Sequence, residues 1–174
     1  MNREIDTLLQ QYEGGQISRR TFIAGMSALM LAANRAVAAD APQLPVASIN
    51  HVTMFVKDVP KTAAFYQDLF GLSVKSHQGN GINLAVGEQS QFLGIFNGPP
   101  NIQPRIDHVC LGVKGFDVQA SLRALSTRGV EGRVRMRDDT VPELYFNDPN
   151  GLSVQLQDET YCGGVGVLGN ECKA

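Results

Sequence analysis

Apolar and polar residues alternate in several short segments between residues 48 and 158, and this spacing predicts β-strands. The last two segments, 142–146 and 152–157, flank Asn-Asp-Pro-Asn-Gly, where proline and glycine favour a tight turn. In the second of them, one face is apolar and the other carries Ser153, Gln155 and Gln157. We therefore predict a β-hairpin whose polar row either faces solvent or lines a site.

An internal repeat organises this region. Residues 49–57, Ile-Asn-His-Val-Thr-Met-Phe-Val-Lys, align without a gap on residues 106–114, Ile-Asp-His-Val-Cys-Leu-Gly-Val-Lys. A helical pattern follows each segment, over about 59–70 and 117–128, with an aspartate at or just before its start and a glycine after its end. In the first helix, Phe65, Tyr66 and Leu69 lie on one side.

Three strand-like segments follow each predicted helix. They cover 72–77, 82–86 and 91–96 in the first repeat, and 130–137, 142–146 and 152–157 in the second. The sequence therefore predicts the order β-α-β-β-β twice, in modules of about 48–98 and 105–158 within one domain, 48–160. Residues 161–174 form a glycine-rich tail in which we predict no regular structure.

The N-terminal segment has the pattern of an export signal. Ser18-Arg19-Arg20-Thr21-Phe22-Ile23 begins an apolar run of about a dozen residues, and a small-residue site follows it. It resembles a twin-arginine signal; the alternative is an amphipathic helix with a chance arginine pair. We predict a signal peptide over 1–39, a linker over 40–47, the twin-arginine export machinery as a partner, and a periplasmic or otherwise exported chain. A transmembrane helix needs about 20 apolar residues, so we expect none in the mature chain.

Charge and cysteine content narrow the function. The formal net charge is −2, which suggests no general role in binding nucleic acid or a membrane surface. Three cysteines are too few for a disulfide scaffold. In an exported chain, however, Cys162 and Cys172 can pair, leaving Cys110 free and holding the tail across a cavity mouth.

The two repeats place histidines at the same position. If the apolar face of each first strand meets its helix, His51, Thr53 and Phe55 lie on the opposite face of one strand, and His108, Cys110 and Gly112 on that of the other. If these faces share a cavity, His51, His108 and Gln155 converge. Two imidazoles and an oxygen donor can bind a divalent metal; the alternative is a structural role for each histidine.

Further side chains have two interpretations. Tyr145 can donate a proton to a substrate or be a half-buried aromatic residue. Arg133, Arg135 and Arg137 alternate along one predicted strand, and they form either a solvated edge or an anion-binding wall. Cys110 is a soft ligand or a small buried residue. Besides Tyr145 as a catalytic residue, the possible substrate contacts are Thr53, Phe55, Cys110, Asn147 and Arg135.

Residues 48–158 resemble the vicinal oxygen chelate superfamily, which includes glyoxalase I, extradiol dioxygenases, fosfomycin-resistance enzymes and bleomycin-binding proteins. The resemblance is carried by both His-containing strands, by the end of the first helix at Phe70-Gly71-Leu72, and by Asp148-Pro149-Asn150-Gly151 followed by Gln155. It implies an α+β fold in which two βαβββ modules form a paired, cup-shaped mixed β-sheet. It also implies a homodimer and metal ligands at His51, His108 and Gln155.

The resemblance favours a metal-dependent enzyme that performs ring-cleaving, extradiol-type chemistry on a small substrate with vicinal oxygens. Gln155 stands where the family usually has glutamate, and Gly94 stands where glyoxalase I has a fourth ligand. Fe(II) is the favoured metal, with Mn(II) or Zn(II) as alternatives. The competing functions are a metal-free binding protein of the bleomycin-resistance type and a glyoxalase-like lyase or isomerase.

Overall fold

The repeat seen in the sequence becomes two halves of one sheet. The computed structural model describes residues 3–40 and 43–173. The first module comprises β1 (Val46–Val56), α3 (Val59–Phe70), β2 (Val74–Gln78), β3 (Gly81–Ala85) and β4 (Phe92–Asn97). The second comprises β5 (Arg105–Val113), α4 (Val118–Thr127), β6 (Arg133–Arg137), β7 (Val141–Asn147) and β8 (Ser153–Asp158). The predicted βαβββ order is therefore confirmed in both modules.

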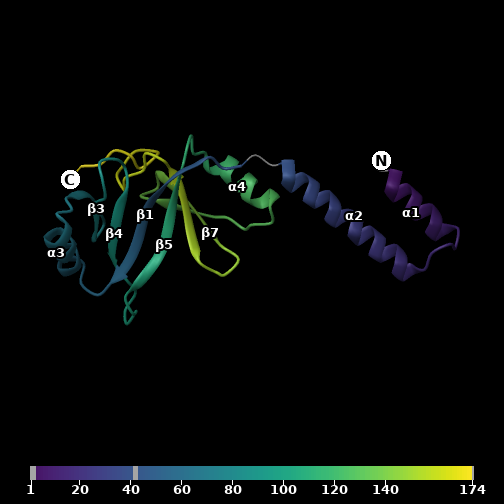
Figure 1. Ribbon diagram of the computed structural model, residues 1–174, viewed down its shortest axis with the longest axis horizontal. Helices are drawn as coiled ribbons and strands as arrows, with labels where there is room; N and C mark the ends of the chain where they lie inside the picture. The colour runs from purple at the N-terminus through teal and green to yellow at the C-terminus, as the bar shows by residue number, and fades with distance from the viewer. Residues whose placement is uncertain (1–2, 41–42, 174) are drawn as a thin grey trace. The chain divides into compact units, whose positions relative to one another are not determined.

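The strand order is β2-β3-β4-β1-β5-β8-β7-β6, so the two modules meet along their first strands. β1 and β5 pair antiparallel, β1 pairs parallel with β4, and β5 pairs parallel with β8. Figure 1 shows β4, β1 and β5 side by side, with α3 toward one end of the sheet and α4 toward the other. The predicted fold class, a paired and curved mixed sheet of two modules, is confirmed.

Each helix covers one face of its own half of the sheet. Val59 and Ala63 of α3 pack with Leu84 and Ile95, and Leu125 of α4 packs with Val113, Leu144 and Leu156. Phe65 and Leu69 of α3 are instead exposed, so the side of that helix on which the sequence groups them is not its core face. The opposite sheet face is left free to build a cavity.

The helix boundaries follow local chemistry. Asp58 accepts a hydrogen bond from the backbone N–H of Lys61 at 2.9 Å, and Asp117 accepts one from Ala120 at 2.6 Å. Gly71 ends α3 with φ +69°, a left-handed conformation that suits glycine. Both helix starts are therefore specified by the residues that the sequence singles out.

The N-terminal unit, Met1–Pro42, is separate from the unit Gln43–Ala174. It contains α1 (Arg3–Glu13) and α2 (Arg19–Asp40), whose Tyr12 and Phe22 rings stack with centroids 4.8 Å apart. Among the described residues, we find no helix with the length and apolar character needed to cross a membrane. Residues 41–42 of the predicted linker lie outside the described residues.

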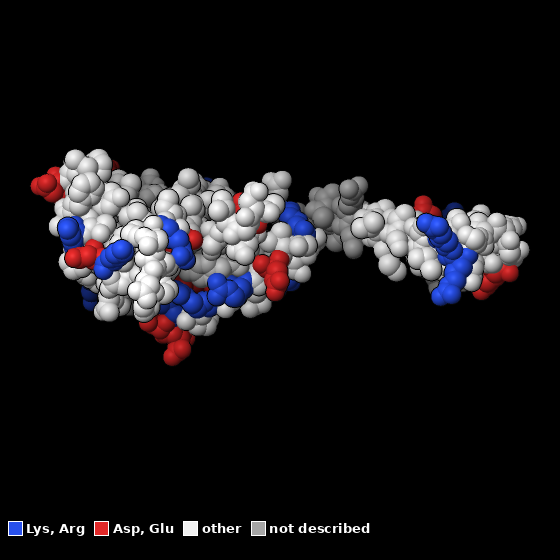
Figure 2. Space-filling model, turned by 90° about the horizontal axis from the view of Figure 1, so that it is seen from below, with Lys and Arg blue, Asp and Glu red and all other residues white. Residues whose placement is uncertain are grey.

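Charged side chains of both signs occupy the surface of the sheet-containing unit. On the face seen in Figure 2, basic side chains lie next to acidic ones. Among the ion pairs of this unit, Arg105 lies 3.6 Å from Asp107 and Arg135 lies 2.6 Å from Glu143. The second of these pairs brings a buried carboxylate to the inner face of the sheet.

Candidate functional site

A cavity of about 260 Å³ lies on the inner face of the sheet. Its wall combines imidazole, aromatic, amide and charged side chains from both modules and one residue beyond β8. The residues that line it include His51, Thr53, Phe55, His108, Arg133, Arg135, Glu143, Tyr145, Gln155 and Tyr161. The strands that meet at the centre of the sheet therefore also line its cavity.

The structure brings His51, His108 and Gln155 together, as the alternation of the strands predicts. In the ladder, Thr53 of β1 pairs with His108 of β5, and Cys110 of β5 pairs with Gln155 of β8. The two imidazole rings have centroids 5.5 Å apart, and Nε2 of His51 lies 3.1 Å from Oε1 of Gln155. All three side chains are buried.

Each histidine is oriented by the residue before it. Nδ1 of His51 lies 2.8 Å from Oδ1 of Asn50, and Nδ1 of His108 lies 2.9 Å from Oδ2 of Asp107. Both oxygens are acceptors, so the hydrogen-bond network places a proton on Nδ1 of each ring. Such a partner fixes the ring and directs the Nε2 lone pair away from it, as it does for metal-binding histidines.

The Nε2 atoms of His51 and His108 lack a hydrogen-bond donor among the described residues. Burial, and then the neighbouring His108, lower the pKa of His51 well below its usual value, while the hydrogen bond that a protonated ring would donate to Gln155 acts in the opposite direction. His51 is therefore neutral, and its Nε2 lone pair faces an amide oxygen that is also an acceptor. Nε2 of His108 and Nε2 of Gln155 are buried without a hydrogen-bond partner in the described part of the chain.

This arrangement fits a divalent cation. Two imidazole nitrogens and an amide oxygen are suitable donors for such an ion, and a cation would resolve the contact between two acceptors. Within residues 3–40 and 43–173, no group of three His, Cys, Asp or Glu residues is placed to hold a metal. The candidate set is therefore neutral, because its third member is the amide of Gln155.

A buried carboxylate forms a second polar centre in the cavity wall. Glu143 Oε2 accepts from Nε of Arg135 at 2.9 Å and from the hydroxyl of Tyr145 at 3.1 Å, and Oε1 accepts from Nε of Arg137 at 3.2 Å. Burial, and then Glu143, raise the pKa of Tyr145 well above its usual value. Tyr145 thus remains a phenol whose proton already points at Glu143, and its catalytic role stays a prediction.

The other predicted contacts divide into two groups. Thr53, Phe55 and Arg135 line the cavity, whereas Cys110 and Asn147 do not belong to its wall. Cys110 is fully buried, and burial raises its thiol pKa, which agrees with the interpretation as a small buried residue. Asn147 is exposed at the end of β7 and lines a separate surface hollow near Pro149.

The arginines of β6 do not act alike. Arg137 is buried and pairs with Glu143, so the interpretation as a solvated edge is wrong for this residue. Arg135 is half-exposed and pairs with the same carboxylate. Arg133 is exposed, lines the cavity and stacks over the Tyr145 ring with its guanidinium carbon 5.4 Å from the centroid.

Sequence reasoning missed Glu143, Asn50, Asp107 and Tyr161. Glu143 has a weak signal, since it lies two residues before Tyr145 on the same strand face and opposite a strand of alternating arginines. Asn50 and Asp107 precede the two repeated histidines, so a polar acceptor at the same position of both repeats was the available signal. Tyr161 follows the last strand and has no periodic pattern around it.

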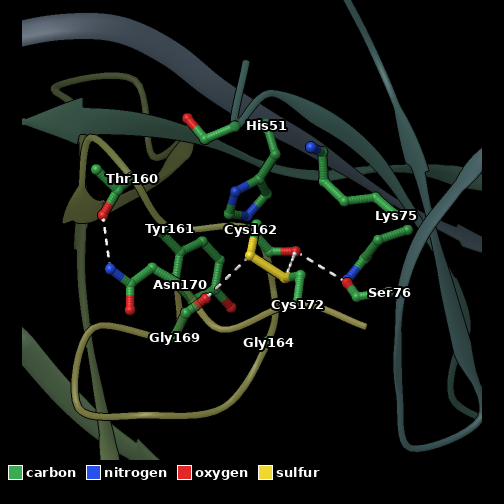
Figure 3. Close-up of a disulfide and its surroundings, with 12 residues drawn as sticks. His51, Lys75, Ser76, Thr160, Tyr161, Cys162, Gly164, Gly169, Asn170 and Cys172 are labelled. Carbon is green, nitrogen blue, oxygen red and sulfur yellow. Dashed lines mark hydrogen bonds between the residues drawn. A yellow bond between two sulfur atoms is a disulfide. The ribbon is translucent and has the colours of Figure 1, made fainter. Parts of the chain in front are cut away.

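The tail closes one side of the cavity. Cys162 and Cys172 form a disulfide and Cys110 is free, as predicted. Tyr161 is buried, and its ring lies 5.5 Å from that of His51 between centroids. Figure 3 shows these two side chains beside the disulfide, and the hydroxyl of Ser76 donates to the carbonyl of Cys162 at 2.9 Å.

Comparison with known proteins agrees with this architecture. Methylmalonyl-CoA epimerase from Mycobacterium tuberculosis superimposes with a TM-score of 0.57 at 18% identity, covering 66% of this chain and 89% of that one. The E323L mutant of homoprotocatechuate 2,3-dioxygenase from Brevibacterium fuscum gives a TM-score of 0.58 at 23% identity, covering 75% and 36%. Its Y257F variant gives 0.58 at 24% identity, covering the same shares.

These structural similarities lie below 25% identity and therefore concern the fold. The sequence comparison extends further, because a profile of one protein family matches residues 48–156, from within β1 to within β8. The chain belongs to the Glyoxalase/Bleomycin resistance protein/Dioxygenase superfamily.

Proposed function

We propose that this chain is an exported, metal-dependent enzyme that performs chemistry like that of extradiol ring-cleaving dioxygenases, and that it assembles as a homodimer. The observation that carries the proposal is the pair of buried, Nδ1-anchored imidazoles facing Gln155. Nε2 of His108 has no partner among the described residues, although burial of a polar atom without a hydrogen bond is costly. A ligand at this point would remove that cost.

His51, His108 and Gln155 would hold the metal. When bound, a divalent metal such as Fe(II) supplies Lewis-acid binding of a substrate through two adjacent oxygens. The residues of the chain prepare the site: Asn50 and Asp107 orient the two rings, and Phe92 stacks on His51 with centroids 4.3 Å apart, which shields that ring from water.

The cavity limits the substrate to a small molecule. Its volume of about 260 Å³ is below the range of roughly 300–1,000 Å³ that is usual for drug-sized ligands, so a single-ring compound is the appropriate size. Glu143 forms ion pairs with Arg135 and Arg137. Arg133 also lines the cavity, and it is exposed, so its guanidinium can meet an incoming ligand. We therefore propose that a substrate carrying a carboxylate is preferred.

A metal-free binding protein is the second candidate, because the contact of 3.1 Å between Nε2 of His51 and Oε1 of Gln155 can also be satisfied without a metal. If the Gln155 amide rotates by half a turn, its nitrogen donates to Nε2 of His51 and the contact between two acceptors disappears. Glyoxalase-type chemistry has less support, because Gly94, which pairs with Thr53 across β1 and β4, offers no side-chain ligand.

Metal analysis tests the proposal. Protein purified from the periplasm should contain close to one equivalent of transition metal, and anaerobic titration with Fe(II), Mn(II) or Zn(II) should show one site that His108→Ala abolishes. The iron-loaded protein should consume oxygen with a catechol such as homoprotocatechuate. A chain that binds none of these metals, while a small ligand protects it against thermal unfolding, would instead support the metal-free candidate.

A further inference from the structure

We propose that the C-terminal segment 159–172 completes the candidate metal site, because it fixes the amide of Asn50 and thereby the tautomer of His51. The part of this inference that concerns metal affinity rests on the proposed function. The part that concerns the tautomer is a property of the metal-free chain. Asn50 is a positioning residue in this scheme, since it acts on the site through His51.

The contacts of Asn50 all depend on that segment. Its side chain is fully buried, and Nδ2 donates to the carbonyl of Tyr161 at 2.9 Å and to the hydroxyl of Ser90 at 3.4 Å. The Ser90 hydroxyl itself donates to the carbonyl of Glu159 at 2.5 Å, which leaves its lone pairs for Asn50. With both amide hydrogens directed in this way, Oδ1 faces Nδ1 of His51 at 2.8 Å.

The orientation of this amide decides which nitrogen of His51 carries the proton. An asparagine amide has an oxygen on one side and a nitrogen donor on the other, with nearly the same shape. If the Tyr161 carbonyl moves away, a half-turn of the amide presents Nδ2 to Nδ1 of His51. The imidazole would then carry its proton on Nε2, which could donate to Gln155 but could not bind a metal.

The disulfide holds the Tyr161 carbonyl in place. Tyr161 immediately precedes Cys162, whose bond to Cys172 closes the tail on itself. Arg137 donates to the carbonyl of Gly164 at 2.6 Å, and Figure 3 shows Gly164 beside the disulfide. The Tyr161 ring packs with Phe92 and Val141, but the chain beyond it is largely turns, and its Val165 and Val167 side chains are exposed. The disulfide therefore restrains the part of the segment that apolar packing holds least, and with it the direction of the backbone at Tyr161.

In the second repeat, the histidine ring is oriented without the tail. His108 is oriented by Asp107, whose carboxylate carries two acceptor oxygens and no donor. Rotation of a carboxylate therefore leaves the Nδ1–H bond intact, whereas rotation of the Asn50 amide reverses it. This difference between the repeats makes His108 an internal control for His51 in the same molecule.

Nitrogen-15 NMR of histidine side chains tests the tautomer in the metal-free full chain. In the oxidised protein, both His51 and His108 should carry the proton on Nδ1. After reduction with a phosphine, confirmed by three reactive thiols in denatured protein, His51 should shift toward the Nε2–H form while His108 does not change. Unchanged nitrogen shifts of His51 in the reduced protein would overturn the inference, as would equal changes in both rings.

Metal titration of the full chain gives the second readout. Cys162→Ser with Cys172→Ser should weaken Mn(II) binding by about 10- to 100-fold, the usual effect of losing a partner that orients a ligand. Adding Asn50→Asp should restore most of that affinity, because a carboxylate accepts from Nδ1 in either orientation. The reduced wild-type chain replaces the serine variant if that variant does not fold.

The outcomes separate the two proposals. Tight Mn(II) binding that is the same in oxidised wild type and in the serine variant refutes the role of the tail and leaves the metal site standing. No metal binding by the oxidised wild type, together with a tautomer shift of His51 on reduction, refutes the metal-dependent function and supports the role of the tail.

Discussion

Gln155→Glu is the most informative perturbation of the candidate site, because the two functions predict opposite results. The side chain of Gln155 is 1% exposed and lies beside Nε2 of His51. In a metal site, the variant adds a negative charge to a neutral ligand set. In a metal-free pocket, it buries a carboxylate with no cation beside it.

The magnitudes follow from simple electrostatics. A unit charge about 4 Å from a divalent ion is worth roughly 8 kcal/mol at an effective dielectric constant of about 20, and removing a carboxylate from water costs several kcal/mol in return. We expect a surplus of about 1.4–3 kcal/mol, which is roughly 10- to 100-fold tighter binding of Fe(II) or Mn(II). In the metal-free pocket, the free energy of unfolding should instead fall by about 2 kcal/mol.

Anaerobic calorimetric titration measures the affinity, and thermal melts with a chelator present measure the stability. A loss of about 2 kcal/mol lowers the Tm by roughly 6 °C in a domain of this size. The melts are run at about pH 8.5, above the pKa of an imidazole even beside a carboxylate, so that His51 stays neutral.

Gln157→Glu is the matched control. Gln157 lies on the same strand, is equally buried at 1% exposure and donates to the carbonyl of Pro142, away from both histidines. Its variant should lower the Tm without changing metal affinity. If Gln155→Glu behaves as Gln157→Glu does, with a lower Tm and unchanged metal binding, Gln155 is not a ligand and the metal-site reasoning is refuted.

Three further predictions concern other parts of the chain. Burial is the main cause that lowers the pKa of His51 in the folded protein, so below about pH 6.5 the unfolded protein takes up a proton that the folded metal-free protein does not. Urea titrations should therefore show the free energy of unfolding falling by up to about 1.4 kcal/mol per pH unit in this range. His51→Gln should flatten that slope. Arg133→Gln should weaken binding of homoprotocatechuate by about fivefold and leave uncharged 4-methylcatechol unaffected, whereas an equal loss for both ligands would argue against charge recognition. Arg19→Lys with Arg20→Lys should retain the precursor in the cytoplasm, while N-terminal sequencing of exported wild type should find a start near residue 40; an exported chain with its first residue intact would contradict the signal-peptide prediction.

The strands, the helix starts and the face on which each histidine lies could be predicted from the sequence, because these features are specified by residues close together in the chain. Alternation along residues 49–57 and 106–114 assigned each histidine to the strand face opposite its helix, and their identical position in two repeats predicted that they converge if those faces share a cavity. Asp58 and Asp117 marked the helix starts through backbone hydrogen bonds made within three residues. The convergence of His51 with Gln155 then needed only the pairing of modules that the family resemblance implied.

Only the tertiary structure decided which residues complete the site. Glu143 pairs with Arg135 and Arg137 because of the register in which β6 and β7 pair. The sequence pattern left these arginines either at a solvated edge or in an anion-binding wall, and it did not indicate their carboxylate partner. Asn50 meets the Tyr161 carbonyl across 111 positions of the chain, through a tail without periodicity. Local patterns report which face a side chain takes, but the partner on that face depends on long-range strand pairing and loop closure, which no short window of sequence contains.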